Sequence, residues 1–160
     1  MIVLLDSNIL DLLATPINKA LSDDEKLLAE VYQCTEWFYR LLSKSARIMT
    51  SDLCDYETRR EFILIKSQSV EELDKLRDLI EFEKLDITVL KKAAELWAEA
   101  RALGKPNKDR ENIDVDVILA AHWCILMKRF PGRQVVLATK NTDDFENVTV
   151  CANWMEITYL

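Results

Sequence analysis

Short apolar runs alternate along the chain with longer segments in which apolar residues recur every three or four positions. The runs predict strands buried on both faces, whereas the wider spacing predicts amphipathic helices. Strands are expected at 2–5, 47–50 and 135–138, with weaker candidates at 85–88 and 148–150. Helices are expected after residue 6, after 22, from 51 to about 67, near 70–83, from 88 to 104 and from about 115 to 129. This alternation predicts an α/β fold with a mainly parallel sheet.

Side chains that can cap a helix stand at four of the expected helix starts. They are Ser22 with Glu25, Ser51, Ser69 with Glu72, and Thr88. Each offers an oxygen atom to backbone N–H groups of the first helical turn, which have no partner within the helix. The segment 105–113 is polar, contains Pro106 and is the one clear loop that the sequence predicts.

The length of 160 residues predicts a single domain spanning 1–160, without room for a second core. Asp and Glu exceed Lys and Arg by 28 to 21, so the formal net charge is −7. Bulk electrostatics therefore does not hold this chain to polyanions. Contact with a nucleic acid would need a local basic patch or a bound cation.

We expect a cytoplasmic protein without a membrane segment. No apolar run is long enough to span a bilayer, and the first residues lack the pattern of a signal peptide. The four cysteines form no CxxC pair, and they are expected to be reduced thiols. His122, the single histidine, lies in an apolar helical segment with no recognisable nucleophile nearby and is expected to be structural.

Acidic residues from several segments are expected at one edge of the sheet. Asp6 directly follows the strand at 2–5, and Asp143 and Asp144 follow the strand at 135–138. Functional groups of open α/β sheets collect beyond the carboxyl ends of the strands. Asp114 and Asp116 stand where a loop enters a helix, and Glu57 lies in the helix after the second strand.

Carboxylates gathered in this way raise one another's pKa and destabilise a fold unless a cation neutralises them. Oxygen ligands suit Mg²⁺ or Mn²⁺, and such an ion can activate water and neutralise a phosphoryl group. Each of these residues, taken alone, could instead have a purely structural role, since Asp at a strand end or helix start often serves as a turn former or N-cap. Glu57 could likewise form a surface pair with Arg60, which shares its helix face.

Helix geometry distinguishes the roles expected for Asp114 and Asp116. Residues two apart on a helix differ by about 200° in direction, so both cannot face one site from within it. Asp114 is better placed as the N-cap, and Asp116 then lies in the first turn. Ala120 is one turn further on, and its small side chain would leave room for a ligand beside Asp116.

Four segments, in order along the chain, resemble the PIN-domain family, and the match is nearest to the VapC-like toxin ribonucleases. They are 4–10 (LLDSNIL), 56–60 (YETRR), 116–121 (DVILAA) and 138–145 (ATKNTDDF). The resemblance spans almost the whole chain. It implies a three-layer α/β/α sandwich and cleavage of single-stranded RNA that depends on Mg²⁺ or Mn²⁺. It also suggests an antitoxin partner and a homodimer.

The same resemblance assigns roles to the acidic residues. Asp6, Glu57 and Asp116 would be the first three metal ligands, and Asn8 would support the site by hydrogen bonding. Asp144 is favoured as the fourth acid, with Asn141 as its polar partner and Asp143 in reserve. Family members differ at this position, so the choice among these three residues stays open.

Lys140 is the best candidate for a contact with RNA phosphates, and Arg60 is another. The loop 105–113 carries further basic residues, and it either contacts RNA or is simply solvated. Two other classes of protein remain as alternatives. One is a PIN-like module that binds a protein or RNA partner without cleaving it. The weaker one is a phosphoacceptor domain with an acidic Mg²⁺ pocket.

Overall fold

The computed structural model describes residues 1–16, 25–65, 67–103 and 113–158, and side chains at 26–28 and 113–114 lie outside this description. The described residues form a five-stranded sheet in which every strand pair is parallel. The strands are β1 (Ile2–Leu5), β2 (Arg47–Ser51), β3 (Glu81–Glu83), β4 (Val135–Thr139) and β5 (Cys151–Asn153), and their order across the sheet is β3-β2-β1-β4-β5. The predicted parallel α/β fold is confirmed.

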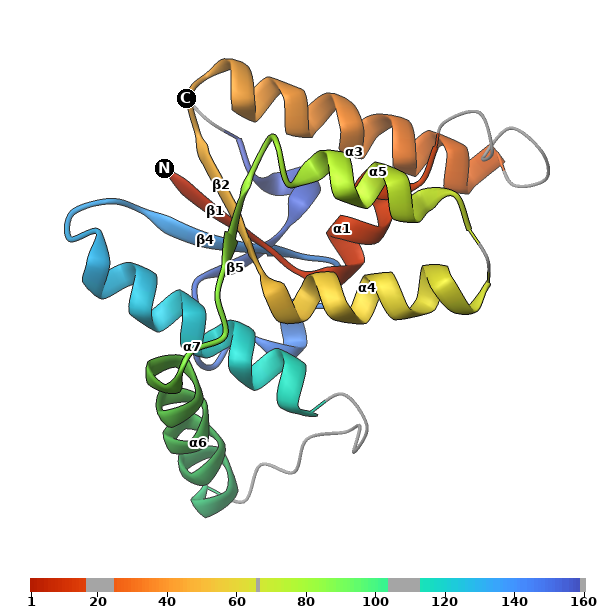
Figure 1. The fold of residues 1–160 in the computed structure, drawn as a ribbon. Helices are drawn as coiled ribbons and strands as arrows, with labels where there is room; N and C mark the ends of the chain where they lie inside the picture. The colour runs from red at the N-terminus through yellow and green to blue at the C-terminus, as the bar shows by residue number, and fades with distance from the viewer. Residues whose placement is uncertain (17–24, 66, 104–112, 159–160) are drawn as a thin grey trace.

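Helices cover both faces of the sheet and complete a three-layer α/β/α sandwich (Figure 1). They are α1 (Ser7–Ala14), α3 (Glu25–Ser43), α4 (Asp52–Leu64), α5 (Ser69–Leu76), α6 (Ile87–Ala102) and α7 (Ile113–Arg129). Helix α1 packs against α3, α4 and α5 on one side of the sheet. On the other side α7 packs against β4, and α6 packs against α7. No helix among the described residues combines the length and apolarity that a bilayer crossing requires.

The central strand β1 is the most buried element of the fold. All four of its residues are inaccessible to solvent, which explains why this segment is an uninterrupted apolar run. It pairs with β2 on one side and β4 on the other, so its carboxyl end lies in the middle of the sheet edge. A residue directly after β1 is therefore held by the best-packed part of the molecule.

Two strand predictions were wrong. The segment predicted as a strand at 85–88 forms no strand; it leads through the N-cap Asp86 into α6, and the third strand lies earlier, at Glu81–Glu83. Its charged residues form ion pairs with neighbouring elements, Glu81 with Arg47 and Glu83 with Arg129. The edge strand expected at 148–150 lies at Cys151–Asn153, because Thr149 turns back and bonds to Phe145 through both its N–H and its hydroxyl group.

The helix expected near 70–83 ends at Leu76, and its predicted capping box is also wrong. The N-cap residue of α5 is Gln68, which makes no side-chain cap bond. The hydroxyl of Ser67 accepts the backbone N–H of Ser69 instead. The Ser51 cap is confirmed, since its Oγ accepts the N–H of Leu53. Ser22 and most of the loop 105–113 lie outside the described residues.

The cap of α6 lies two residues before the predicted position. Asp86, rather than Thr88, is the N-cap of α6, and one carboxylate oxygen accepts the N–H groups of Thr88 and Val89 at 2.8 and 3.0 Å.

The four cysteines are free thiols, as expected. Cys34 and Cys54 are buried, and Cys124 and Cys151 are half-buried.

Replacing the true cap should destabilise the protein more than replacing the predicted one. Asp86→Ala removes the acceptor for two N–H groups and should lower the free energy of unfolding by about 1 kcal/mol. Thr88→Ala, at an exposed helical position, should be neutral within roughly 0.5 kcal/mol because Ala is the better helix former. Urea unfolding of both variants measures the difference, and equal effects would contradict the cap assignment.

Candidate active site

Asp6 occupies the carboxyl end of β1 and is also the N-cap of α1. Its backbone N–H still bonds to Ala138 of β4, and its Oδ1 accepts the N–H of Ser7 at 2.7 Å and the Ser7 hydroxyl at 3.3 Å. The residue is only 4% exposed. The strand passes directly into the helix, so the side chain that caps the helix also points along the sheet edge.

The second oxygen of Asp6 is bound from two different elements. Oδ2 accepts the Asn8 side-chain amide at 2.7 Å and the Thr139 hydroxyl at 2.7 Å. Asn8 Oδ1 in turn accepts the backbone N–H of Lys140 at 3.2 Å, which ties the start of α1 to the exit of β4. Asn8, which the resemblance assigns to supporting the site, is thus hydrogen-bonded to Asp6.

Thr139 belongs to this arrangement and was not among the predicted site residues. It is fully buried at the end of β4, and its single hydroxyl donates to Asp6 while accepting from Asn141 N–H at 3.0 Å. The signal in the sequence is a lone polar residue that closes an otherwise apolar strand, immediately before the candidate acids. Such a residue must find buried partners, and here the partner is a carboxylate.

The electrostatics of Asp6 favour a bound cation. Burial raises the pKa of Asp6, hydrogen bonds from Thr139 and Ser7 oppose that rise, and the nearby charge of Glu57 raises the pKa further. Within the described part of the chain no Lys or Arg forms an ion pair with Asp6. A divalent ion would offset both the burial and the repulsion. Mg²⁺ is commonly held by one or two carboxylates together with water, and the Asp6–Glu57 pair fits that chemistry.

Glu57 lies half-buried on α4, and the alternative surface pair with Arg60 is not formed. The guanidinium group of Arg60 lies 3.6 Å from Glu61 and over the ring of Tyr56, at 5.7 Å from its centroid. No residue that the structure describes forms an ion pair with Glu57. Its carboxylate could therefore serve as a metal ligand without first leaving an ion pair of the described residues.

Asp116 is half-buried in the first turn of α7, one turn before the buried Ala120. Helix α7 begins at Ile113, so Asp114 falls inside the helix rather than before it, against the N-cap prediction. Across the described side chains, no three His, Cys, Asp or Glu groups already lie close enough to hold a metal ion. The charge of Glu57 acts on Asp6, and the contributions of Glu57 and Asp116 to a metal site stay predictions.

The fourth candidate segment lies directly after Thr139. Residues 142–144 form a short 3₁₀ helix, and a polar cavity of about 250 Å³ is lined by Lys140, Asn141, Thr142, Asp143 and Asp144. Asn141, Asp143 and Asp144 are all exposed. The choice of fourth acid among them stays a prediction, because all three side chains remain accessible beside the Asp6 edge.

The two residues predicted to contact phosphates, Lys140 and Arg60, are both exposed. They differ in how closely each is paired with an acidic residue. Lys140 Nζ lies 2.7 Å from the Glu30 carboxylate on α3, so it would have to leave or share that partner to reach a phosphate. Arg60 projects from α4, three residues after Glu57, and pairs only loosely with Glu61 at 3.6 Å.

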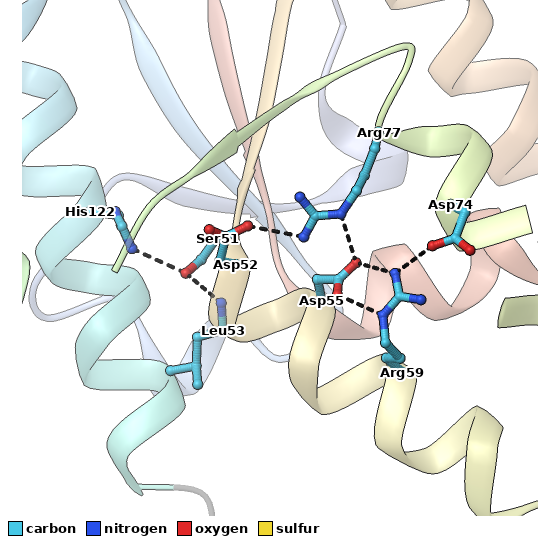
Figure 2. Close-up of polar contacts among 8 residues, drawn as sticks. All are labelled: Ser51, Asp52, Leu53, Asp55, Arg59, Asp74, Arg77 and His122. Carbon is cyan, nitrogen blue, oxygen red and sulfur yellow. Dashed lines mark hydrogen bonds and ion pairs between the residues drawn. The ribbon is translucent and has the colours of Figure 1, made fainter. Parts of the chain in front are cut away.

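A second acid on α4, Asp55, is buried and serves a different purpose (Figure 2). It is bound by Arg59 at 2.9 Å and by Arg77 at 3.4 Å, and these arginines also pair with Asp74 and Asp52. Burial would raise the pKa of Asp55, but the hydrogen bonds and charges of the two arginines outweigh it and hold the pKa below its usual value. This network joins α4 to α5 and to the segment before β3.

His122 is a buried residue of α7, only 1% exposed, and its neighbour Ser51 is inaccessible to solvent as well. Its Nε2 lies 3.0 Å from the Oγ of Ser51, and Figure 2 shows this contact beside the cap bond to Leu53. Burial lowers the pKa of His122 below its ordinary value of 6.5. The neutral ring is therefore the form that the fold favours.

Comparison with known proteins supports the fold independently of the site. No protein-family model and no curated protein sequence matches the chain. Among solved structures, VapBC-1 from nontypeable Haemophilus influenzae matches with a TM-score of 0.63 at 16% identity, over 98% of this chain and 100% of that one. VapBC2 from Rickettsia felis, bound to a DNA fragment from the promoter, gives 0.57 at 20% identity over 96% and 99% of the two chains.

A third match is the DNA-bound VapBC from Salmonella typhimurium, with a TM-score of 0.55 at 16% identity over 96% of this chain and 98% of that one. The class of fold is therefore a PIN-like α/β/α sandwich that carries acids at the carboxyl edge of its sheet. Within that class, the chain has the VapC-like PIN-domain fold.

Thr139 should be important for the stability of the site. Thr139→Val removes the hydroxyl that donates to a charged carboxylate and should lower the free energy of unfolding at neutral pH by about 1.5–3 kcal/mol. Thr139→Ser keeps the hydroxyl and should lose no more than about 1 kcal/mol. Denaturant unfolding at pH 7 distinguishes the variants, and equal stability of the Val and Ser variants would contradict the role of this hydrogen bond.

His122 should make stability depend on pH. Because its pKa is lowered in the folded state, its contribution is fully present above the unfolded value of 6.5 and is lost as pH falls below it. The free energy of unfolding should therefore fall more steeply between about pH 7 and pH 5 in the natural protein than in His122→Gln. Parallel slopes, measured by urea unfolding at each pH, would count against this assignment.

Proposed function

We propose that this protein is an endoribonuclease that cleaves single-stranded RNA with the help of Mg²⁺ or Mn²⁺. The observation that carries the proposal is the buried Asp6 carboxylate, which is oriented by three neighbouring side chains, lies near Glu57 and has no cationic partner among the described residues. The VapC-like fold is consistent with nuclease activity in general.

Asp6, Glu57, Asp116 and Asp144 would hold the ion, with Asn141 and Asp143 as neighbours of the fourth acid. A bound Mg²⁺ or Mn²⁺ lowers the pKa of its water and neutralises charge on the phosphate. Asn8 and Thr139 keep the Asp6 carboxylate in one orientation, and their hydrogen bonds favour its ionised form. No side-chain nucleophile is required for hydrolysis of this kind.

The basic residues nearest this edge would bind the substrate backbone. Lys140 lies beside the polar cavity at 140–144, and Arg60 follows Glu57 on α4. Phosphate contacts compensate for the net charge of −7, which otherwise repels RNA. When the substrate binds, Lys140 would leave its ion pair with Glu30 and bind a phosphate group instead.

We further propose that the protein acts in the cytoplasm as the toxin of a toxin–antitoxin pair and forms a homodimer. The support is the likeness to three VapBC structures, each of which aligns over at least 96% of this chain. An antitoxin would be a protein that binds this chain and inhibits cleavage. Co-expression with the product of a neighbouring small gene tests this directly, by copurification and by loss of RNA cleavage.

RNA cleavage should require both the ion and Asp6. With a pool of single-stranded RNA oligonucleotides, Mn²⁺ should support cleavage and a chelator should abolish it. Asp6→Asn should reduce the rate on the order of 100-fold or more, because it removes a charge that acts in the transition state. The matched control Asp78→Asn, at an exposed acid after α5, should cleave at the natural rate.

Activity that is indifferent to the chelator and to Asp6→Asn would contradict the proposal. Absence of cleavage together with absence of Mn²⁺ binding by calorimetry would favour a PIN-like module that binds a partner without cleaving RNA.

A further inference from the structure

A buried hydrogen bond between Ser51 and His122 joins the start of α4 to the middle of α7 (Figure 2). Ser51 is inaccessible to solvent and His122 is 1% exposed. The Oγ of Ser51 lies 3.0 Å from His122 Nε2 and also accepts the N–H of Leu53 at 3.1 Å. One hydroxyl group therefore both begins α4 and connects that helix end to α7.

Each of these helices carries one of the acids assigned to the metal. Glu57 lies six residues after Ser51, and Asp116 lies six residues before His122. In each helix this is about 9 Å along the axis from the hydrogen bond. The described part of α7 packs mainly against α6 and β4, whereas α4 packs mainly against α1 and α5. Neither helix runs along the other, so a specific contact between them has a large effect on their spacing.

We infer that the Ser51–His122 hydrogen bond is a positioning contact, which sets the spacing of the Glu57 and Asp116 carboxylates and thereby the affinity for a divalent ion. The inference rests on the proposed function. Separating α4 from α7 would leave a buried hydroxyl and a buried ring nitrogen without partners, which is costly in an apolar interior. Ligand groups around an ion must be held to within about 0.5 Å, and supporting hydrogen bonds provide that precision.

Substitutions at His122 test the contact. His122→Leu fills a similar space without a ring nitrogen, and His122→Gln returns an amide that can bond to Ser51. Calorimetric titration should give a Kd for Mn²⁺ about tenfold higher for His122→Leu than for the natural protein, and His122→Gln should return to within about threefold.

Leu126→Ala is the matched control, since Leu126 is fully buried one turn further along α7. It should lower the melting temperature while leaving the Kd for Mn²⁺ unchanged. An equal loss of affinity in Leu126→Ala would show that general loosening of α7 is sufficient, and would overturn the inference. If His122→Leu does not fold, Ser51→Ala takes its place, with Ser51→Thr as the variant that keeps the hydroxyl.

Hydrogen exchange without metal separates this inference from the proposed function. Amides 53–55 in the first turn of α4 should exchange roughly tenfold faster in His122→Leu than in the natural protein, and Leu126→Ala should not change them. Unchanged exchange in a folded His122→Leu overturns the contact. Faster exchange with an unchanged Kd for Mn²⁺ overturns its role in metal binding. A natural protein that binds no Mn²⁺ contradicts the proposed function itself, and faster exchange would then still support the link between α4 and α7.

Discussion

One buried carboxylate, Asp6 at the end of the central strand, organises the candidate site. Asp6 follows four residues that are inaccessible to solvent, so its backbone is fixed by the best-packed strand of the sheet. Its two oxygens are bound by groups from the start of α1 and from the end of β4. These hydrogen bonds hold the Asp6 carboxylate in one orientation, and burial raises its pKa.

The predictions from the sequence were right for the elements in which the pattern of apolar residues alone determines whether a strand or a helix forms. The strand β1 is apolar throughout and β4 is apolar up to Thr139, because both faces of these strands are covered. The long helices α3 and α7 follow from apolar residues at helical spacing. Asp6 could be placed at the carboxyl edge of the sheet because it directly follows a buried parallel strand, whereas the role of Asn8 came from the family resemblance.

The wrong predictions of strands and caps lie where two local patterns compete. Other features were missed because contacts between residues far apart in the sequence determine them. A strand at 85–88 was expected, but ion pairs with Arg47 and Arg129 hold the strand at Glu81–Glu83 instead. The bonds of Thr139 to Asp6 and of Ser51 to His122 join residues 133 and 71 positions apart. No local spacing indicates such pairs, so these two hydrogen bonds could be found only in the folded structure.

The most direct test of the central claim is a crystal structure of the protein grown with Mn²⁺ and measured at the manganese absorption edge. The account predicts an anomalous peak about 2–2.3 Å from carboxylate oxygens of Asp6 and Glu57, at the carboxyl edge of the sheet. A protein saturated with Mn²⁺ in which the ion lies elsewhere, with Asp6 still bound only by Ser7, Asn8 and Thr139, would contradict it.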